Sequence, residues 1–407
     1  MTQANTVNSL PLPDQDASAH SGKVKQCLIE KIAVTGSISF SEYMDTTLYE
    51  PGLGYYSAGS TKLGDEGDFI TAPEISSLFS QSIAQAILPA LESIEDCSIL
   101  EVGAGSGKMA AAILEHLDSL NRLPTHYYIL ELSADLQLRQ KELLKEKVPN
   151  FYERVIWLDS IPENLNAVVI ANELLDAMPV VRFRKEPDGV TIEHVKVVDG
   201  EFQFSYSNDN LDEKNQSEIL SRTQQRVKQI EEIVGKLEDG FISEINFNAE
   251  DWLASIAEKL NSGVIILIDY GYPRHEYYHP QRNEGTLNCF YRHRHHNNPF
   301  LYPGLQDLTA HIDFTAIADS GIDNGLKLVG YTSQTNFLFG AGIAQLAEAR
   351  NQTYADDDII SQIELSNKVK KLTMPFEMGE IVKVICFSKN CQTKLAAFDF
   401  KDMCDHL

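Results

Sequence analysis

Positive charge is scarce in this chain of 407 residues. Lysine and arginine number 34 against 59 aspartates and glutamates, which gives a formal net charge of -25. Such a surface repels phosphate backbones unless a local basic patch intervenes. The composition therefore argues against nucleic acid as a partner, and solubility remains open as the other reason for the acidity.

Paired cysteines are missing as well. The six cysteines contain no C-x-x-C pair, so the sequence predicts neither a zinc site nor a disulfide framework. We expect a reducing compartment.

Long apolar runs are also absent. No stretch approaches the roughly 20 residues that a membrane helix needs, so we expect a soluble protein without membrane insertion. Residues 1–23 contain prolines and aspartates but no arginine, which is typical of neither a secretory signal nor a transit peptide. We interpret them as a disordered tail, and their composition favours a bacterial cytoplasm over a mitochondrial matrix.

Short apolar runs alternate with amphipathic helices from Ser98 onward. This alternation is typical of a parallel sheet with crossover helices. The predicted strands are 98–102, 127–130, 155–158, 167–171 and 264–268, with two more within 326–339 and 381–387, and the predicted helices are 24–35, 77–91, 108–120, 134–147 and 249–260. We expect a large α/β domain with a seven-stranded, mostly parallel sheet.

An antiparallel insertion interrupts this pattern. Residues 180–206 alternate apolar and polar around the turn pairs Asp188-Gly189 and Asp199-Gly200, which predicts hairpins. A polar helix is expected at 211–237, and residues 273–304 are interpreted as a long loop rich in His, Arg, Pro and Tyr.

The first strand runs into the glycine-rich segment Glu101–Gly107 (EVGAGSG), followed by a helix. Glycines let the backbone turn sharply and approach a ligand. The spacing does not match a dinucleotide fingerprint (G-x-G-x-x-G/A), because Lys108 occupies the position of its third small residue. It does not match a P-loop either, because Met109 stands where a P-loop has a serine or threonine hydroxyl. The segment resembles motif I of class I methyltransferases, with Gly103, Gly105 and Gly107 as its glycines.

That resemblance implies S-adenosyl-L-methionine as cofactor, S-adenosyl-L-homocysteine as product and no metal. Glu101 fits, because this cofactor carries an ammonium and a sulfonium, which a carboxylate attracts. Glu131, at the end of the second strand, is expected to bind the ribose hydroxyls. Asp159 and Ser160, after the third strand, are expected to bind the adenine. Ordinary solvated strand ends are the alternative for these positions.

The fourth strand ends in ANELLDAMPV, which places Asn172, Glu173 and Asp176 beside the expected methyl donor. Methyl transfer is an in-line displacement, so the protein mainly orients the acceptor. Glu173 and Asp176 suit a guanidinium, whereas Asn172 suits a neutral amide or amine. Capping of the following turn is the alternative for all three.

Several segments together resemble the MidA family, also called the mitochondrial complex I assembly methyltransferases. They are 40–56 (FSEYMDTTLYEPGLGYY), 67–76 (GDFITAPEIS), EVGAGSG, 131–133 (ELS), ANELLDAMPV, 268–271 (IDYG), 285–287 (GTL) and 307–315 (DLTAHIDFT). The resemblance implies a Rossmann-like methyltransferase with an inserted antiparallel lobe. For mitochondrial members it implies symmetric dimethylation of an arginine in a complex I subunit. ANELLDA also resembles the glutamate-bearing loop of arginine methyltransferases, which implies Glu173 as a guanidinium ligand.

Two further groups of residues are site hypotheses. Asp68, Thr71, Pro73 and Glu74 would cover the cofactor if the N-terminal segment folds over the sheet edge. His311 and Asp313 could line the acceptor pocket, although a buried histidine satisfied by its neighbours is the alternative. The basic segment 291–296 is either a docking patch or a solvated loop.

The expected organisation follows from these assignments. It consists of a tail (1–23), an N-terminal segment covering the cofactor and substrate site (24–97), a Rossmann-like core in two parts (98–181 and 249–390), the inserted lobe (182–248), a substrate loop (272–312) and a C-terminal tail (391–407).

The leading hypothesis for function is an S-adenosylmethionine-dependent protein arginine methyltransferase with a protein substrate, such as a complex I subunit. One alternative is an assembly factor that binds S-adenosylmethionine without turnover. An NAD-dependent oxidoreductase is disfavoured by Lys108. A homodimer is left open.

Overall fold

The chain forms two compact units that alternate along the sequence. The computed structural model describes residues 10–58, 71–206, 215–355 and 357–407. We call Ile70–Leu175, Glu250–Gly271 and Phe314–Leu407 the sheet unit, and Met1–Phe69, Asp176–Ala249 and Tyr272–Asp313 the lobe unit. The lobe unit thus gathers the N-terminal segment, the insertion and the region expected to be a substrate loop.

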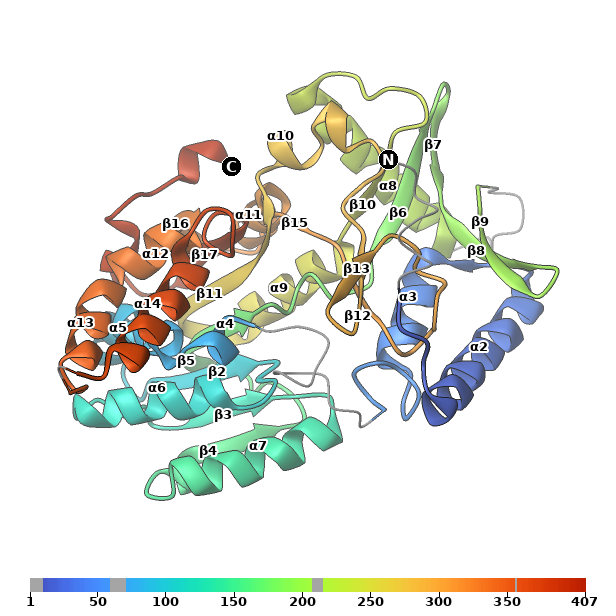
Figure 1. Ribbon diagram of the computed structural model, residues 1–407. Coiled ribbons are helices and arrows are strands. Elements are labelled where there is room, and N and C mark those ends of the chain that lie inside the picture. The colour runs from blue at the N-terminus through green and yellow to red at the C-terminus, as the bar shows by residue number, and fades with distance from the viewer. Residues whose placement is uncertain (1–9, 59–70, 207–214, 356) are drawn as a thin grey trace. The chain divides into compact units, whose positions relative to one another are not determined.

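The sheet unit is built on a mostly parallel sheet (Figure 1). In the described residues its main path has the order β16-β17-β11-β5-β2-β3-β4. Neighbours from β11 to β4 pair in parallel, whereas β17 is antiparallel to β11 and to β16. The strands are β2 (Ser98–Val102), β3 (Tyr127–Leu130), β4 (Val155–Leu158), β5 (Leu165–Asn172), β11 (Leu260–Tyr272), β16 (Lys327–Ser333) and β17 (Val382–Lys389). The predicted α/β Rossmann-like fold is confirmed.

The direction in which strands are added reverses next to β2. From β2 the chain proceeds to β3 and β4 on one side, and then returns to place β5 and β11 on the other side. In open α/β sheets, ligands bind outside the carboxyl ends of the strands at such a reversal. The ends of β2 and β5, which carry the glycine-rich segment and Asn172, meet at this point.

Helices cover both faces of this sheet (Figure 1). Because side chains alternate along a strand, Val168 and Ile170 of β5 share one buried cluster with helices of one face. On the other face, Gly321 of α11 packs so closely that a Cβ there would lie 2.5 Å from the ring of Phe387. The unit's helices are α4 (Ala72–Ile75), α5 (Ser77–Ser93), α6 (Lys108–Ser119), α7 (Ala134–Lys147), α9 (Phe247–Lys259, shared with the lobe unit), α11 (Phe314–Asp323), α12 (Gln334–Gly340), α13 (Ile343–Asn351) and α14 (Ile359–Thr373), with 3-10 turns at Tyr152–Arg154, Ala396–Phe398 and Cys404–His406.

The described residues of the lobe unit form three antiparallel sheets of three strands each, in the orders β1-β8-β9, β10-β6-β7 and β13-β12-β14. Both predicted hairpins are present. Asp199 and Gly200 have φ of 52° and 81°, the left-handed pair that a tight two-residue hairpin turn requires. The strands of these sheets are β1 (Ile38–Ser39), β6 (Val181–Glu186), β7 (Gly189–Ile192), β8 (His194–Val198), β9 (Glu201–Ser205), β10 (Ile242–Ile245), β12 (Asn288–Tyr291), β13 (Arg294–His296) and β14 (Asp307–Thr309). The short strand β15 (Ile312–Asp313) belongs to none of the three.

The first helix of the lobe unit starts earlier than predicted. Helix α2 (Gln15–Thr35) begins within the segment that we interpreted as a disordered tail. The Asp14 carboxylate accepts the backbone N–H of Ala17 at 2.8 Å, which satisfies one of the free donors at the helix start. The helix therefore begins at Gln15, before the apolar spacing on which the prediction rested. The remaining helices are α3 (Phe40–Tyr49), α8 (Asn215–Val234) and α10 (Arg274–Tyr277), with a 3-10 turn at Pro280–Arg282.

Two other predictions were wrong in detail. The expected loop 273–304 contains α10, β12 and β13, which are too short for periodicity to reveal them. The run 326–339, which was expected to supply a strand, does so only as far as Ser333, whose side chain accepts the N–H of Asn336 and caps α12. A capping serine therefore divides one apolar run into a strand and a helix.

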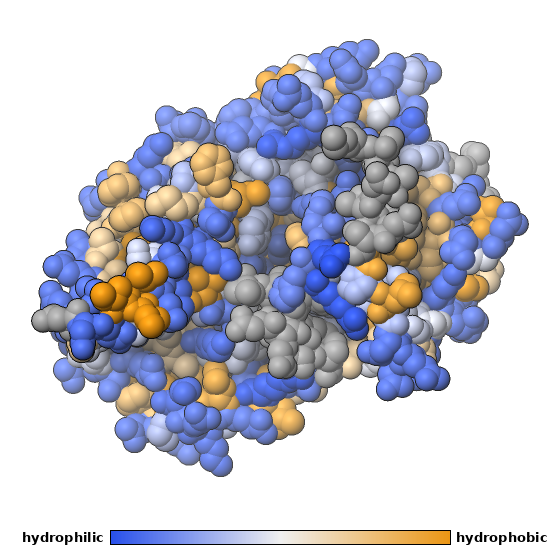
Figure 2. Space-filling view, in the orientation of Figure 1, coloured by the Kyte–Doolittle hydropathy of each residue, from blue (hydrophilic) through white to orange (hydrophobic). Residues whose placement is uncertain are grey.

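The surface seen in Figure 2 is predominantly hydrophilic, as the net charge implies. An apolar patch stands out over α14, whose residues Ile359, Ile360 and Ile363 are exposed. Among the described residues, no helix is both long and apolar enough to cross a membrane.

A buried cluster of charges lies in the lobe unit. Arg182 of β6 pairs with Glu193 and, at 3.0 Å, with Glu244 of β10. Both carboxylates are fully buried, and Glu244 also accepts the backbone N–H of Thr286 at 2.7 Å. Removing the cation from such a cluster leaves buried charge uncompensated, which is far more costly than losing an exposed ion pair.

Arg182→Met is therefore expected to lower the free energy of unfolding by about 3–5 kcal/mol in urea titrations. Lys25→Met is the matched control, because it removes a cation from an exposed pair with Glu201 at 3.1 Å and should cost less than about 1 kcal/mol. Equal stability losses in the two variants would contradict the assigned role of Arg182.

Candidate functional site

The glycine-rich loop after β2 adopts a backbone that only glycine adopts easily. Gly103, Gly105 and Gly107 have φ of 73°, 54° and 82°, all in the left-handed region. A Cβ at Gly103 would lie 3.0 Å from Cδ1 of Leu174, and one at Gly107 would lie 3.3 Å from Cγ of Gln140. The loop therefore fits closely between the turn after β5 and helix α7.

Glu101, on β2 just before this loop, is a buried carboxylate. Its Oε2 accepts a hydrogen bond from the Tyr127 hydroxyl at 2.6 Å. Burial raises the pKa of Glu101 to about 7; the nearby Glu131 also raises it, whereas the Tyr127 hydrogen bond lowers it. At neutral pH this group is thus close to its titration midpoint.

Glu131, directly after β3, is linked to the glycine-rich loop through Gln140 of α7. Its two carboxylate oxygens accept the Ser133 N–H at 3.0 Å and the Gln140 amide at 3.1 Å. The same amide donates to the Gly105 carbonyl at 2.9 Å. Burial raises the pKa of Glu131, and these hydrogen bonds oppose that rise.

Gln140 is a site residue that sequence reasoning missed. It is fully buried, and its side-chain oxygen accepts the Trp157 indole N–H at 2.9 Å. One signal was present: Gln140 stands between Leu136 and Leu144 at helical spacing, so a polar residue occupies the inward stripe of α7.

The turn after β5 brings Asn172 and Glu173 to the point where the strand order reverses. Oε1 of Glu173 accepts the Asn172 side-chain amide and the Ala72 backbone N–H, each at 3.3 Å. Glu173 has a left-handed φ of 49°, which is unusual for a residue with a side chain. The Asn172 Oδ1 is buried without a partner in the described structure, so it can accept a hydrogen bond from a ligand.

Asp269 of β11 holds that turn in place. It is 1% exposed, and its Oδ2 accepts the backbone N–H groups of Leu174 at 3.1 Å and Leu175 at 2.8 Å. The sequence assigned no role to Asp269, although it lies in the IDYG segment. The carboxylate acts by positioning Glu173 through the backbone.

Helix α4 connects the segment before the sheet to the glycine-rich loop. Thr71 precedes the helix and Pro73 lies in its first turn. The carboxylate of Glu74 accepts the Ser106 hydroxyl and pairs with Lys108, and its side chain is 6% exposed. This part of the predicted cover contacts the loop. Asp68 lies outside the described residues.

The remaining predicted residues lie in different surroundings. Asp159 and Ser160 follow β4 and are exposed. In the lobe unit, the Asp176 carbonyl accepts the Ala310 N–H at 2.9 Å, and Asp313 forms a buried ion pair with Arg274 at 3.0 Å. His311 contacts the Tyr272 ring edge-on, at 5.3 Å between ring centroids. In the part of the chain that the structure describes, no three His, Cys, Asp or Glu side chains gather as metal ligands.

Comparison with known proteins identifies the family to which this chain belongs. Residues 82–332 match the family model described as "Putative S-adenosyl-L-methionine-dependent methyltransferase". The chain belongs to this family. It is therefore an S-adenosylmethionine-dependent methyltransferase of the Rossmann-like class, as the sequence predicts.

Relatives and solved structures match over most of their length. The protein arginine methyltransferase NDUFAF7 homolog of Drosophila melanogaster is 27% identical, covering 90% of this chain and 85% of that protein. The mouse protein arginine methyltransferase NDUFAF7 is 25% identical, with 91% and 89% covered. A Burkholderia thailandensis crystal structure bound to S-adenosyl-homocysteine is 40% identical, with a TM-score of 0.90 and coverage of 98% of this chain and 100% of that chain.

The residues at the sheet edge fit this cofactor. The glycine-rich loop leaves room for a ligand close to the backbone, and the buried Asn172 oxygen can accept a hydrogen bond from an ammonium. Glu101 supplies negative charge for a cationic ligand, and Glu131 remains the predicted ribose ligand. These carboxylates would repel a pyrophosphate.

The raised pKa of Glu101 predicts that cofactor affinity depends on pH. The group is mostly protonated at pH 6 and mostly ionised at pH 8, and a cationic ligand prefers the ionised form. The affinity for S-adenosylmethionine, measured by calorimetry, should therefore rise about tenfold from pH 6 to pH 8. Glu101→Gln should bind more weakly at pH 8 with little pH dependence. An unchanged pH profile in that variant would contradict the assignment.

Proposed function

We propose that this methyltransferase modifies an arginine side chain of a protein substrate, using S-adenosylmethionine as methyl donor. The relatives named as protein arginine methyltransferases support the proposal at about 25% identity. The resemblance to the complex I assembly methyltransferases adds a respiratory complex I subunit as candidate substrate. The scarcity of positive charge disfavours a nucleic acid.

The position and backbone conformation of Glu173 are the observation that carries this proposal. Its carboxylate stands at the carboxyl end of β5, where the strand order reverses, on a backbone with φ of 49°. A non-glycine residue in this region costs of order 1–3 kcal/mol, and such strain concentrates at functional sites. The Asp269 hydrogen bonds stabilise the turn against relaxation.

The chemistry of the acceptor explains why a carboxylate is needed. A guanidinium with a pKa above about 12 stays charged, and a carboxylate can hold its planar fork and direct one nitrogen at the donor. When bound, S-adenosylmethionine supplies an electrophilic methyl group. Glu173 would orient the guanidinium and favour a lone pair on the attacking nitrogen. Asp176, which belongs to the lobe unit, stays a prediction from the sequence.

Glu173→Gln tests this role without removing the side chain. The amide oxygen can still accept the Ala72 N–H, but the negative charge is lost. We expect kcat to fall roughly 10²–10³-fold, while S-adenosylmethionine affinity stays within about threefold. Glu142→Gln, an exposed change on α7, is the matched control and should leave both unchanged.

The substrate is identified with methyl-labelled S-adenosylmethionine and a bacterial lysate, followed by mass spectrometry. A labelled arginine that disappears with Glu173→Gln supports the proposal and names the substrate. Label on another side chain would refute arginine specificity. No label from a preparation that binds the cofactor would favour an assembly factor without turnover.

A further inference from the structure

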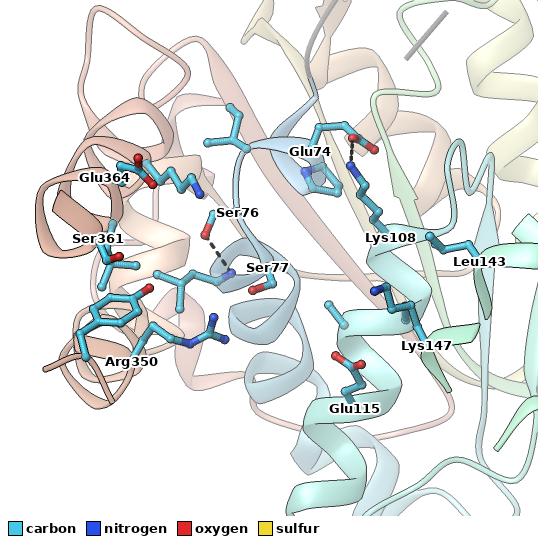
Figure 3. Close-up of a pocket in the computed structure, with 18 residues that line it drawn as sticks. Glu74, Ser76, Ser77, Lys108, Glu115, Leu143, Lys147, Arg350, Ser361 and Glu364 are labelled. Atoms are coloured by element: carbon cyan, nitrogen blue, oxygen red, sulfur yellow. Dashed lines mark hydrogen bonds and ion pairs between the residues drawn. The ribbon is translucent and has the colours of Figure 1, made fainter. Parts of the chain in front are cut away.

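A cavity of about 380 Å³ opens within the sheet unit beside the Glu74–Lys108 ion pair. Its walls come from α4, from the start of α5 and from helices α6, α7, α13 and α14. Lys108 lines it, but Glu101, Glu131 and Glu173 do not. The cavity therefore adjoins Pro73 and Glu74 of the predicted cofactor cover, but not the carboxylates at the sheet edge. Figure 3 shows Lys108 and Lys147 on one side, with Arg350 and Ser361 across the cavity.

Basic side chains reach this cavity from four helices. They are Lys108 of α6, Lys147 of α7, Arg350 of α13 and Lys368 of α14. Arg350 and Lys368 form no ion pair with the described residues, and Lys147 lies 3.2 Å from the exposed Glu146. In a chain with a net charge of -25, this convergence of cations is distinctive.

Three carboxylates also line the cavity, but they do not cancel this charge. Glu74 already pairs with Lys108, which leaves Glu115 and Glu364 opposite three cations. The hydroxyl groups of Ser77, Ser361 and Tyr354 can donate hydrogen bonds from the wall. The cavity therefore offers more donors and positive charge than negative charge, which suits an anionic group.

Part of the lining is apolar. Leu78 and Leu365 line the cavity and are buried, and Ala111, Ala112 and Leu143 line it as well. Inorganic phosphate would leave that surface uncovered, whereas a ligand with a hydrocarbon or aromatic part would cover it.

We propose that this cavity binds a phosphate monoester that carries an apolar group. A phosphate monoester bears a charge of about -1.5 to -2 near pH 7 and three acceptor oxygens. Lys147, Arg350 and Lys368 approach from three separate helices and can contact different oxygens of one tetrahedral group. The apolar lining then contacts the remainder of the ligand.

Lys108 couples this cavity to the glycine-rich loop. It lines the cavity and pairs with Glu74, which in turn accepts the hydroxyl of Ser106 in that loop. A bound phosphate competes with Glu74 for Lys108 and weakens this link. Occupancy of the cavity should therefore lower the affinity for S-adenosylmethionine. By thermodynamic linkage, bound cofactor should lower the affinity for the phosphate ligand by the same factor. This inference does not depend on arginine as the methyl acceptor.

The test is calorimetric titration of the full chain with phenyl phosphate, with inorganic phosphate and phenol as partial probes. We expect phenyl phosphate to bind more tightly than either partial probe. The double variant R350A/K368A should weaken it at least tenfold. The matched control K370A/K371A removes two exposed cations of α14 that do not line the cavity, and it should have little effect. Saturating phenyl phosphate should lower S-adenosylmethionine affinity several-fold in the unmodified protein.

Each contrary result is decisive. Absence of phenyl phosphate binding to a protein that binds S-adenosylmethionine overturns the site. Equal losses in the two double variants would show that overall charge, and not this cavity, holds the anion. Binding that leaves the cofactor affinity unchanged contradicts the coupling through Lys108. S-adenosylmethionine binding by each variant verifies that it is folded.

Discussion

Asp269 determines the shape of the turn on which the proposed catalytic carboxylate stands. Its two oxygens accept three backbone N–H groups, those of Tyr270, Leu174 and Leu175. The next strand thereby fixes the backbone that follows Glu173, and the Glu173 N–H itself donates to the Ile268 carbonyl at 2.8 Å. A left-handed glutamate persists only where surrounding hydrogen bonds determine it in this way. Gly103 depends on the same turn, because Leu174 packs against it.

The parallel sheet concentrates acidic groups at one edge. Glu101 lies on β2, Glu131 follows β3 and Glu173 follows β5, and the carboxyl ends of parallel strands point the same way. Such a group of carboxylates is costly when buried, which is why the pKa of Glu101 rises. A cationic cofactor would offset that cost. The electrostatics that disfavour a diphosphate thus favour a sulfonium and an ammonium.

In the lobe unit, buried carboxylates are paired with arginine side chains. Arg182 pairs with two glutamates, and Asp313, which the sequence suggested as lining the acceptor pocket, pairs with the buried Arg274. Arg182 and Glu244 are 62 residues apart in the chain, and Arg274 and Asp313 are 39 residues apart. Whether a carboxylate is neutralised inside the protein therefore depends on packing that no local pattern contains.

The sequence alone determined the strands β2, β3 and β4 and the helix α7, with bounds that agree with the structure. It also located the glycine-rich loop and the family to which the chain belongs. These features depend on local periodicity and on glycine's backbone freedom, and both can be read along the chain. Only the tertiary structure revealed Gln140 beneath Glu131, Asp269 behind Glu173 and Glu74 on the glycine-rich loop. Each of these contacts joins residues from different elements, and they meet only when the strands and helices pack.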